Sequence, residues 1–398
     1  MYYRPTSKLL SLVRHLKTNL SSYQIAYNNC RESHNLPFQH AREMKNSLLR
    51  SILKQNSEVD PLVKNLLQGV VEGRRAALAE SITLVESSSA RKKLKAKELI
   101  YLILQYMKSK NVLKTNLSFR IGLSGPPGAG KSTFIESFGK FLTSTNLKVA
   151  VLAVDPSSAT TGGSILGDKT RMPELSKDKN AFIRPSPSRG YLGGVTRSTN
   201  EAILLCEASG YDVIIVETVG VGQSEYSVAD MVDLFALLIP PGSGDELQGI
   251  KRGIMELSDI VIVNKSDGDL VNAAMRVQYE YISALKYMPQ KCLYWKPVVK
   301  RVSSITGEGI KELWEIMINF KGKIITKGEF KRKREHQQKA WMWTHIQDNV
   351  ANSFLKIPSI QEAIKVCESQ VIEEVITPGQ AADLILLKII EEVGKMGK

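Results

Sequence analysis

Residues Gly125–Thr133 have the sequence GPPGAGKST, which follows the Gly-x-x-x-x-Gly-Lys-Ser pattern of a phosphate-binding loop. The largely apolar run Leu117–Leu123 comes before this stretch. After it, Phe134–Leu142 carries apolar residues at helical spacing. A strand, a glycine-rich loop and a helix form the context in which this pattern binds a triphosphate. The sequence therefore predicts a phosphate-binding loop at the end of a buried strand.

Each residue type in this loop has a physical task. Glycines allow backbone N–H groups to turn toward an anion, and the helix N-terminus adds a partial positive charge. Lys131 brings a full charge to the β- and γ-phosphates, and Ser132 brings a hydroxyl for Mg²⁺. We therefore expect the nucleotide to be bound by Gly125, Pro126, Pro127, Gly128, Ala129, Gly130, Lys131, Ser132 and Thr133.

The composition is that of a globular protein with more than one unit. The chain has 398 residues, of which 43% are hydrophobic, and this length suggests two or three units. No run of apolar residues is long enough to predict a membrane span. The cysteines are far apart and form no Cys-x-x-Cys pair, which favours a reduced compartment without structural zinc.

The net charge of +14 is unevenly distributed. Residues 1–31 contribute five basic residues and no acidic one. Two further basic runs, Ala90–Lys97 and Lys331–Lys339, are predicted to be solvated faces of helices. Because the charge is dispersed in this way, a nucleic-acid partner is not expected.

Residues 1–31 have the composition of a mitochondrial transit segment. Apolar residues such as Leu9, Val13 and Leu20 recur at roughly helical spacing, with Arg14 and Lys17 between them. A basic, amphipathic, serine-bearing and acid-poor leader is typical of import into the mitochondrion, here the matrix. The alternative is a disordered basic tail.

An α/β fold is predicted downstream of this leader. The runs Val149–Val154 and Val213–Val216 are apolar throughout, as in central parallel strands that helices cover on both faces. Amphipathic stretches between the strands predict helices at Asn200–Ser209, Gln248–Glu256, Leu270–Lys286 and Ile310–Phe320. We expect a doubly wound, mostly parallel sheet with its ligand at the carboxyl ends of the strands. The predicted strands are Leu117–Ser124, Val149–Val154, Asp212–Glu217, Leu234–Ile239, Ile260–Asn264 and Val298–Ser303.

Helical regions flank the predicted sheet. Residues 44–113 contain four amphipathic pieces that need another surface to cover them. The stretch Lys331–Leu355 and the last helix, Ala381–Val393, carry more apolar residues than a solvated arm would. This tail packs either on the core or on a second subunit. The predicted units are a transit segment (1–31), a helical region (32–113), a P-loop domain (114–320) and a C-terminal helical region (321–398).

Asn264-Lys265-Ser266-Asp267 follows an apolar strand and predicts guanine recognition. The short carboxylate of Asp267 can accept hydrogen bonds from N1–H and the 2-amino group of guanine, which adenine lacks. Asn264 can bind the N7 edge, and the Lys265 stem can lie over the base. Ser303, Ser304 and Ile305 end the next predicted strand, where their backbone can contact the base O6.

Three acids are candidates for holding Mg²⁺, its waters or the attacking water. Glu217 ends an apolar strand and precedes the glycine-rich stretch VGVG, as does the second metal-binding acid of P-loop NTPases. Asp155 ends the strand after the phosphate loop, and Asp168 follows in the stretch GDKTRM. We expect Lys131, Asp155, Asp168 and Glu217 to serve hydrolysis, and Ser132, Asp155 and Glu217 to ligate the metal.

Together these motifs resemble the methylmalonyl-CoA mutase-associated GTPases, called MeaB or ArgK in bacteria. The resemblance runs from about Gln68 to near the C-terminus, and the basic leader fits the mitochondrial branch. It rests on Gly125–Thr133, Val154–Ser158, Gly167–Met172, Arg184–Gly190, Gly193–Val195, Glu217–Glu225 and Asp245–Lys251.

The resemblance implies a homodimeric GTPase chaperone of methylmalonyl-CoA mutase. In such a protein, GTP binding and hydrolysis gate the delivery of adenosylcobalamin and protect the mutase from inactivation. The resemblance also makes Gly242–Lys251 a loop that signals the nucleotide state, with Asp245, Glu246, Gln248 and Lys251 as its polar contacts. No arginine near the phosphate loop is evident as a source of catalytic charge, so slow intrinsic hydrolysis, accelerated by the mutase, is expected.

Three other functions remain open from the sequence. A nickel metallochaperone GTPase of the same class generally carries a His-rich tract, whereas the five histidines here are scattered. A non-catalytic RNA-binding or scaffold protein would bind nucleic acid in a salt-sensitive way that does not depend on Lys131. A protein kinase would need a catalytic-loop base, and no such motif is evident.

Overall fold

The computed structural model describes residues 59–87, 89–112, 118–154, 172–185, 192–218, 224–242 and 252–396. The predicted transit segment 1–31 and the first of the predicted N-terminal helical pieces lie outside these ranges.

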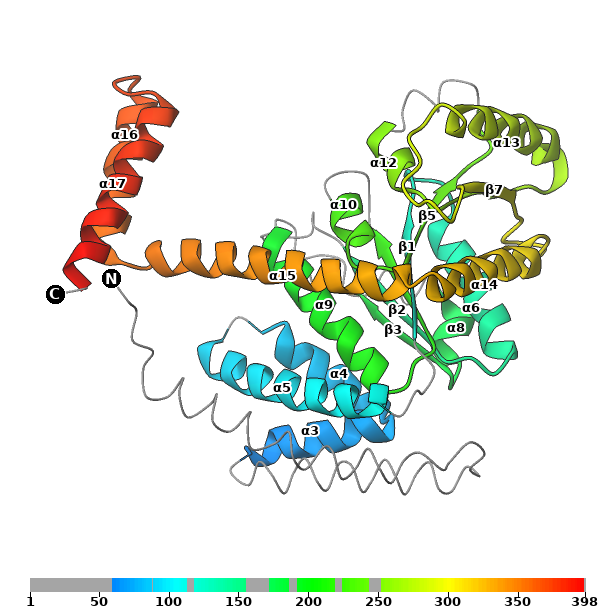
Figure 1. Cartoon of the computed structure of the whole chain (residues 1–398), viewed down its shortest axis with the longest axis horizontal. Helices are drawn as coiled ribbons and strands as arrows, with labels where there is room; N and C mark the ends of the chain where they lie inside the picture. Colours follow the sequence, from blue (N-terminus) through cyan, green and yellow to red (C-terminus); the bar gives the residue numbers. More distant parts are fainter. Residues whose placement is uncertain are drawn as a thin grey trace.

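A parallel β-sheet forms the centre of the structure (Figure 1). Within the described residues it has seven strands in the order β3-β2-β4-β1-β5-β6-β7, and every neighbouring pair is parallel. This confirms the predicted α/β fold class. The strands are β1 (Phe119–Ser124), β2 (Val149–Val154), β3 (Ala181–Pro185), β4 (Val213–Thr218), β5 (Leu234–Ile239), β6 (Ile260–Val263) and β7 (Val298–Arg301).

The alternation of side chains along each strand builds one core on each face of the sheet. In β4, Ile214 and Val216 join one buried cluster, and Val213 and Ile215 join the other. Helices cover both clusters, so the sheet is doubly wound. One face packs against α3 (Pro61–Glu72), α4 (Arg75–Val85), α5 (Ala90–Val112), α9 (Leu192–Ala208), α10 (Ser224–Ala229), α12 (Arg252–Leu257) and α13 (Val271–Leu285), and the other against α6 (Lys131–Ser144), α8 (Pro173–Lys177) and α14 (Ile310–Thr326).

Strand β3 and the start of α9 differ from the sequence prediction, and helices α8 and α10 were not predicted. Strand β3, at the edge of the sheet, was not predicted. Two of its five residues are Arg184 and Pro185, so the stretch lacks the apolar run by which the other strands were predicted. Helix α9 begins at Leu192 rather than Asn200. Its first turn contains Gly193 and Gly194, which are weak helix formers, so local preference gave no signal for a helix starting here.

Helix α15 (Glu329–Phe354) joins the sheet domain to the C-terminal helices α16 (Pro358–Ile372) and α17 (Pro378–Met396). Its first half lies against the sheet domain, and its second half leads outward to α16 and α17, which pack on each other (Figure 1). Trp341 still contacts the core, and its indole Nε1 donates to the Asp230 carbonyl at 3.3 Å. Beyond it, the side chains of Trp343, Ile346 and Val350 are at least 41% exposed.

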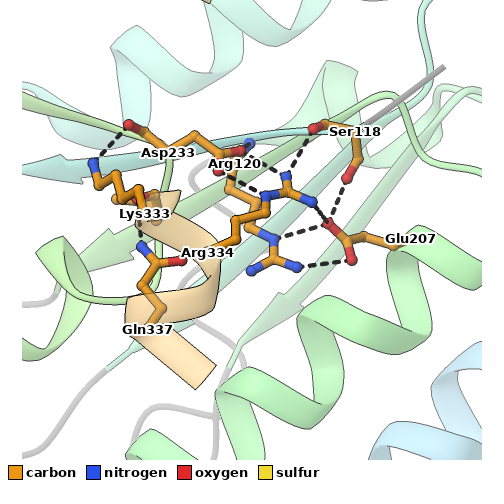
Figure 2. A network of polar contacts seen from close by, with 8 residues as sticks. Ser118, Arg120, Glu207, Asp233, Lys333, Arg334 and Gln337 are labelled. Carbon is orange, nitrogen blue, oxygen red and sulfur yellow. Dashed lines mark hydrogen bonds and ion pairs between the residues drawn. The ribbon is translucent and has the colours of Figure 1, made fainter. Parts of the chain in front are cut away.

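A buried ionic cluster fixes the first half of α15 (Figure 2). The Arg334 guanidinium donates to both carboxylate oxygens of Asp233, at 2.8 and 2.9 Å, and lies 3.3 Å from Glu207. Glu207 at the end of α9 also accepts two hydrogen bonds from Arg120 of β1, at 2.8 and 2.9 Å. The Ser118 hydroxyl donates to the same carboxylate. The cluster therefore ties α15 to β1, α9 and the start of β5.

The arginines also determine the charge state of Glu207. Burial by itself would raise the pKa of this carboxyl group, but the charges of Arg120 and Arg334 and the hydrogen bonds from Arg120 and Ser118 lower its pKa to about 2. Burial would lower the pKa of Arg334, but the charge of Asp233, its hydrogen bonds and the charge of Glu207 together offset this, so the pKa rises above its ordinary value. Glu207 and Arg334 are therefore both ionised at neutral pH.

The prediction that Lys331–Lys339 forms a solvated face is wrong for Lys333, Arg334 and Gln337. The Lys333 side chain is 27% exposed, and its Nζ donates to the Asp233 carbonyl at 2.7 Å. The Arg334 side chain is only 18% exposed, and Gln337 is 3% exposed with its Nε2 donating to the Val232 carbonyl at 2.8 Å. The prediction holds for Lys331 and Arg332, which are exposed and pair with acids on their own helix. The difference arises because the acids that neutralise Arg334 come from distant parts of the chain.

Replacing Arg334 is expected to lower the free energy of unfolding. Arg334→Met removes one of the cations facing the buried carboxylates of Asp233 and Glu207, and breaking a buried pair costs about 3–5 kcal/mol. Arg332→Met is the matched control, because the Arg332 side chain is 73% exposed and pairs with Glu329 on its own helix, outside the buried cluster. Its replacement should lower the free energy of unfolding by about 1 kcal/mol or less. Urea unfolding monitored by circular dichroism measures both; equal losses in the two variants would contradict the structural role of the cluster.

Acid should weaken the fold through Glu207. Because its folded pKa of about 2 lies below the ordinary value of 4.5, its contribution is present above pH 4.5 and is lost as the pH falls toward 2. Near pH 3 the unfolded chain therefore binds one more proton at this site than the folded chain. In Glu207→Gln, the slope of unfolding free energy against pH should be smaller by about 1.4 kcal/mol per pH unit. Identical slopes in urea titrations from pH 5 to 3 would refute the assignment.

Candidate functional site

The predicted phosphate loop lies at the carboxyl edge of the sheet, between β1 and α6. Gly128 and Gly130 have φ angles of 81° and 86°, in the left-handed region that favours glycine. A Cβ atom at Gly125 would lie 2.1 Å from the Leu238 carbonyl oxygen, so only glycine fits there. The chain can therefore turn tightly from β1 into the first turn of α6, where N–H groups have no partner inside the helix.

Lys131 folds back over this loop. Its Nζ donates to the carbonyls of Gly125 at 2.7 Å and Pro126 at 3.3 Å. Ser132 and Thr133 follow in the same first turn of α6. The ammonium group thus lies at the start of the loop, where it can exchange these carbonyl oxygens for phosphate oxygens.

Asn264 joins the phosphate loop to the predicted base-binding segments. Its Nδ2 donates to the Ala129 carbonyl at 3.0 Å. Its Oδ1 accepts from the Ser304 hydroxyl at 2.6 Å and from the Ser304 N–H at 3.3 Å. The side chain is buried, and Nδ2 has one further hydrogen to offer a base. The Asn264 amide therefore holds three segments in register and leaves one N–H for recognition of N7.

The carboxylate of Asp267 is oriented by Ser303. The Ser303 hydroxyl donates to Asp267 Oδ2, and the Thr306 N–H donates to the Ser303 oxygen at 3.0 Å. Lys265 adopts a left-handed conformation, with φ of 55°. Ile305 is 78% exposed, so its side chain contributes little to this cluster. One oxygen of Asp267 is thus held by the protein, and the other can accept hydrogen bonds from a base.

Gly130 is packed closely against this segment. A Cβ atom at Gly130 would lie 2.7 Å from Asn264 Nδ2 and 3.7 Å from Lys265 Cε. The contact brings the Lys265 stem within reach of the phosphate loop. The residues predicted to bind phosphate and those predicted to bind the base therefore lie next to one another.

Glu217 lies on the strand next to the phosphate-loop strand. It is 5% exposed near the end of β4, and its register partner in β1 is Leu123. The following residue, Thr218, donates through its hydroxyl to the Ser124 hydroxyl at 3.0 Å. The Glu217 carboxylate and the Ser132 hydroxyl are hard oxygen donors at one edge of the sheet, and this donor chemistry fits Mg²⁺.

Several predicted residues cannot be placed. Asp155, Asp168, Asp245, Glu246, Gln248 and Lys251 lie outside the described residues. Within the described ranges, no group of three or more His, Cys, Asp or Glu residues is arranged to hold a metal ion. The hydrogen bond from Thr218 to Ser124 was not predicted from the sequence. The position of Thr218 directly after Glu217 was the one sequence feature that could have indicated it. In the same ranges, no helix has both the length and the apolar character needed to cross a membrane.

Comparison with known proteins identifies relatives of the whole fold. Residues 78–359 match the family model described as methylmalonyl Co-A mutase-associated GTPase MeaB. The mouse protein named methylmalonic aciduria type A homolog, mitochondrial, is 56% identical over 81% of this chain and 79% of its own length. The Escherichia coli GTPase ArgK is 47% identical over 71% of this chain and 82% of its own length. A crystal structure titled LAO/AO transport system kinase superposes with a TM-score of 0.64 at 35% identity, covering 83% of this chain and 97% of the other.

Asp267→Asn tests the predicted base recognition. Replacing the carboxylate with an amide puts an N–H donor opposite the N1–H and 2-amino donors of guanine, so GTP affinity should fall at least about 100-fold. Xanthosine triphosphate carries a carbonyl in place of the 2-amino group, so its affinity should rise. Titration calorimetry with both nucleotides measures the exchange, and Asp269→Asn, on an exposed residue two positions later, is the control. Unchanged preference for GTP in Asp267→Asn would exclude this residue from base recognition.

Proposed function

The chain belongs to the family of methylmalonyl-CoA mutase-associated GTPases, and we propose that it uses GTP hydrolysis to serve methylmalonyl-CoA mutase as a chaperone. In this role it gates the loading of adenosylcobalamin and protects or reactivates the mutase. The GTPase activity follows from the family. The mutase partner is supported by the name of the family and by the match over residues 78–359.

The observation that supports the nucleotide assignment is the pair of contacts made by the Asn264 side chain, which we call the Asn264 bridge. Asn264 donates to the Ala129 carbonyl in the phosphate loop and accepts from Ser304. The neighbouring Ser303 holds the carboxylate of Asp267. A triphosphate at Lys131 and a guanine at Asp267 then belong to one ligand, GTP. Lys265 and Ser303–Ile305 complete the base side of this proposed site.

The phosphate side is proposed to work by electrostatics. Lys131 and the N–H groups at the start of α6 stabilise the charge on the β- and γ-phosphates. Mg²⁺ would be held by Ser132, Asp155 and Glu217, and when bound it supplies further positive charge to the same oxygens. We assign Asp168, with Asp155 and Glu217, to orienting the attacking water.

The partner side of the proposal involves the segment Gly242–Lys251, between β5 and α12. We propose that Asp245, Glu246, Gln248 and Lys251 contact the mutase and report the nucleotide state. No role is proposed for nucleic acid. In support, Arg334 in the basic run Lys331–Lys339 is neutralised internally by Asp233 and Glu207.

A mitochondrial location is supported by the mouse and Caenorhabditis elegans relatives, both of which are named as mitochondrial proteins. The C. elegans protein is 48% identical over 82% of this chain and 83% of its own length. We propose import into the matrix through residues 1–31, followed by a helical region to residue 113 and the GTPase domain to residue 320.

Residues 321–398 are proposed to form a homodimer. Their helices expose large apolar side chains, including Trp343 at 59%, Leu387 at 63% and Ile372 at 81%. Such exposure exceeds that of isolated apolar residues on an ordinary surface, and pairing with a second copy would cover it.

A mutase titration tests the proposed function. Hydrolysis of GTP by the purified chain alone should be slow and should rise as methylmalonyl-CoA mutase is added. Lys131→Ala should lower turnover by about 100-fold or more with and without mutase, because the lysine charge on the phosphates is lost. Lys327→Ala, an exposed lysine over the Tyr294 ring, is the control and should behave as wild type. Phosphate release that does not respond to mutase would rule out the chaperone role.

A further inference from the structure

Helices α10 and α12 meet through a contact that only glycine permits. A Cβ atom at Gly253, in the first turn of α12, would lie 2.0 Å from the Tyr226 hydroxyl oxygen and 3.3 Å from the ring carbon Cζ. The tip of the Tyr226 side chain, from α10, therefore rests on the backbone of α12. The two helices also pack on each other more generally.

Helix α10 rests directly on the strands that carry the site. It packs against β1 and β4, whose carboxyl ends lead to the phosphate loop and to Glu217. The approach is close: a Cβ atom at Gly122 in β1 would lie 3.0 Å from Val228 Cγ1. Gly122 precedes the phosphate loop by three residues. A shift of α10 would therefore move the side chains that it packs against in β1 and β4, close to the predicted phosphate loop and to Glu217.

Helix α12 begins directly after Lys251, the last residue of the segment proposed to contact the mutase. Its residues Ile254 and Met255 are buried in the same core cluster as Val228 of α10. The side of α12 that faces α10 at its first turn is Gly253, covered by Tyr226. The position of that first turn is thus set partly by α10.

We propose that Tyr226 and Gly253 are positioning residues that couple the nucleotide site to the mutase-contacting segment. The proposal rests on the function proposed above for Gly242–Lys251. The path runs from β4 and β1 into α10, through the Tyr226 hydroxyl to the Gly253 backbone, and along the chain from α12 into the segment before it. Each step is a packed contact between described elements or a covalent connection.

The geometry provides a pair of compensating substitutions. Gly253→Ala places a methyl group where the Tyr226 hydroxyl lies, so the tyrosine, which is 47% exposed, must swing outward. Tyr226→Phe removes the hydroxyl oxygen. In the double variant the new methyl group lies 3.3 Å from Cζ before any adjustment. A shift of a few tenths of an ångström relieves this crowding and leaves the ring in contact with α12. Gly322→Ala is the control, since a Cβ there has no neighbour within 4 Å.

Hydrogen–deuterium exchange on the full chain measures the coupling without the mutase. In the wild type, a peptide covering residues 252–257 should exchange differently with GDP and with a non-hydrolysable GTP analogue. Gly253→Ala should reduce this difference about fivefold, at the lower end of the usual coupling between sites. The double variant should recover most of it, because the two substitutions are in contact and are not additive. Gly322→Ala should match the wild type.

The same variants are then compared in the mutase titration. Gly253→Ala should retain GTP affinity and basal hydrolysis but lose about fivefold in the stimulation by mutase, with recovery in the double variant. A full exchange difference in Gly253→Ala, or a double variant as impaired as Gly253→Ala, would overturn the proposal. If mutase fails to stimulate even the wild type, the partner assignment fails, and the exchange measurement still decides whether the contact couples the two helices.

Discussion

The structure depends on strand β1, because it is fixed at both ends by polar interactions of different kinds. At its start, Arg120 donates to the buried Glu207, and the Arg120 backbone N–H donates to Asp233 at 2.9 Å. At its end, Ser124 accepts from Thr218, and the next residue begins the phosphate loop. Between these ends, β1 is paired with β4 on one side and β5 on the other. The phosphate loop is therefore presented by a strand with little freedom to move, as preorganised electrostatic stabilisation of phosphate requires.

The ionic cluster at the start of β1 contributes more to arrangement than to net stability. Removing charges from water is expensive, and apolar groups of the same volume would often stabilise a fold as well. The cluster instead determines how α15 is placed, because the Arg334 guanidinium contacts Asp233, Glu207 and the Ser118 carbonyl at the same time. These three acceptors together fix the first half of α15 against the sheet domain.

Structure could be predicted from the sequence where it depends on neighbouring residues, and could not where it depends on contacts between residues far apart in the chain. Apolar runs predicted β2 and β5 with their observed bounds, and the GKS pattern predicted the turn from β1 into α6. The burial of Arg334 could not be predicted, because Asp233 lies 101 positions away and nothing near Arg334 distinguishes it from exposed Arg332. The Asn264 contact with Ala129 spans 135 positions, so the motif predicted a role in base binding but not the bridge between loops.

A rigid β1 also limits where a response to GTP can arise. The phosphate loop is held by β1, by the Asn264 bridge and by close packing at Gly125 and Gly130, so it offers few alternative arrangements. Strand β4, which carries Glu217, is followed along the chain by α10, and β5 is followed by α12. These two helices meet at Tyr226 and Gly253. Conformational change needs an element with two arrangements that both sites bias. We place such an element at the α10–α12 pair, where the partly exposed Tyr226 side chain meets Gly253 above a core that both helices share.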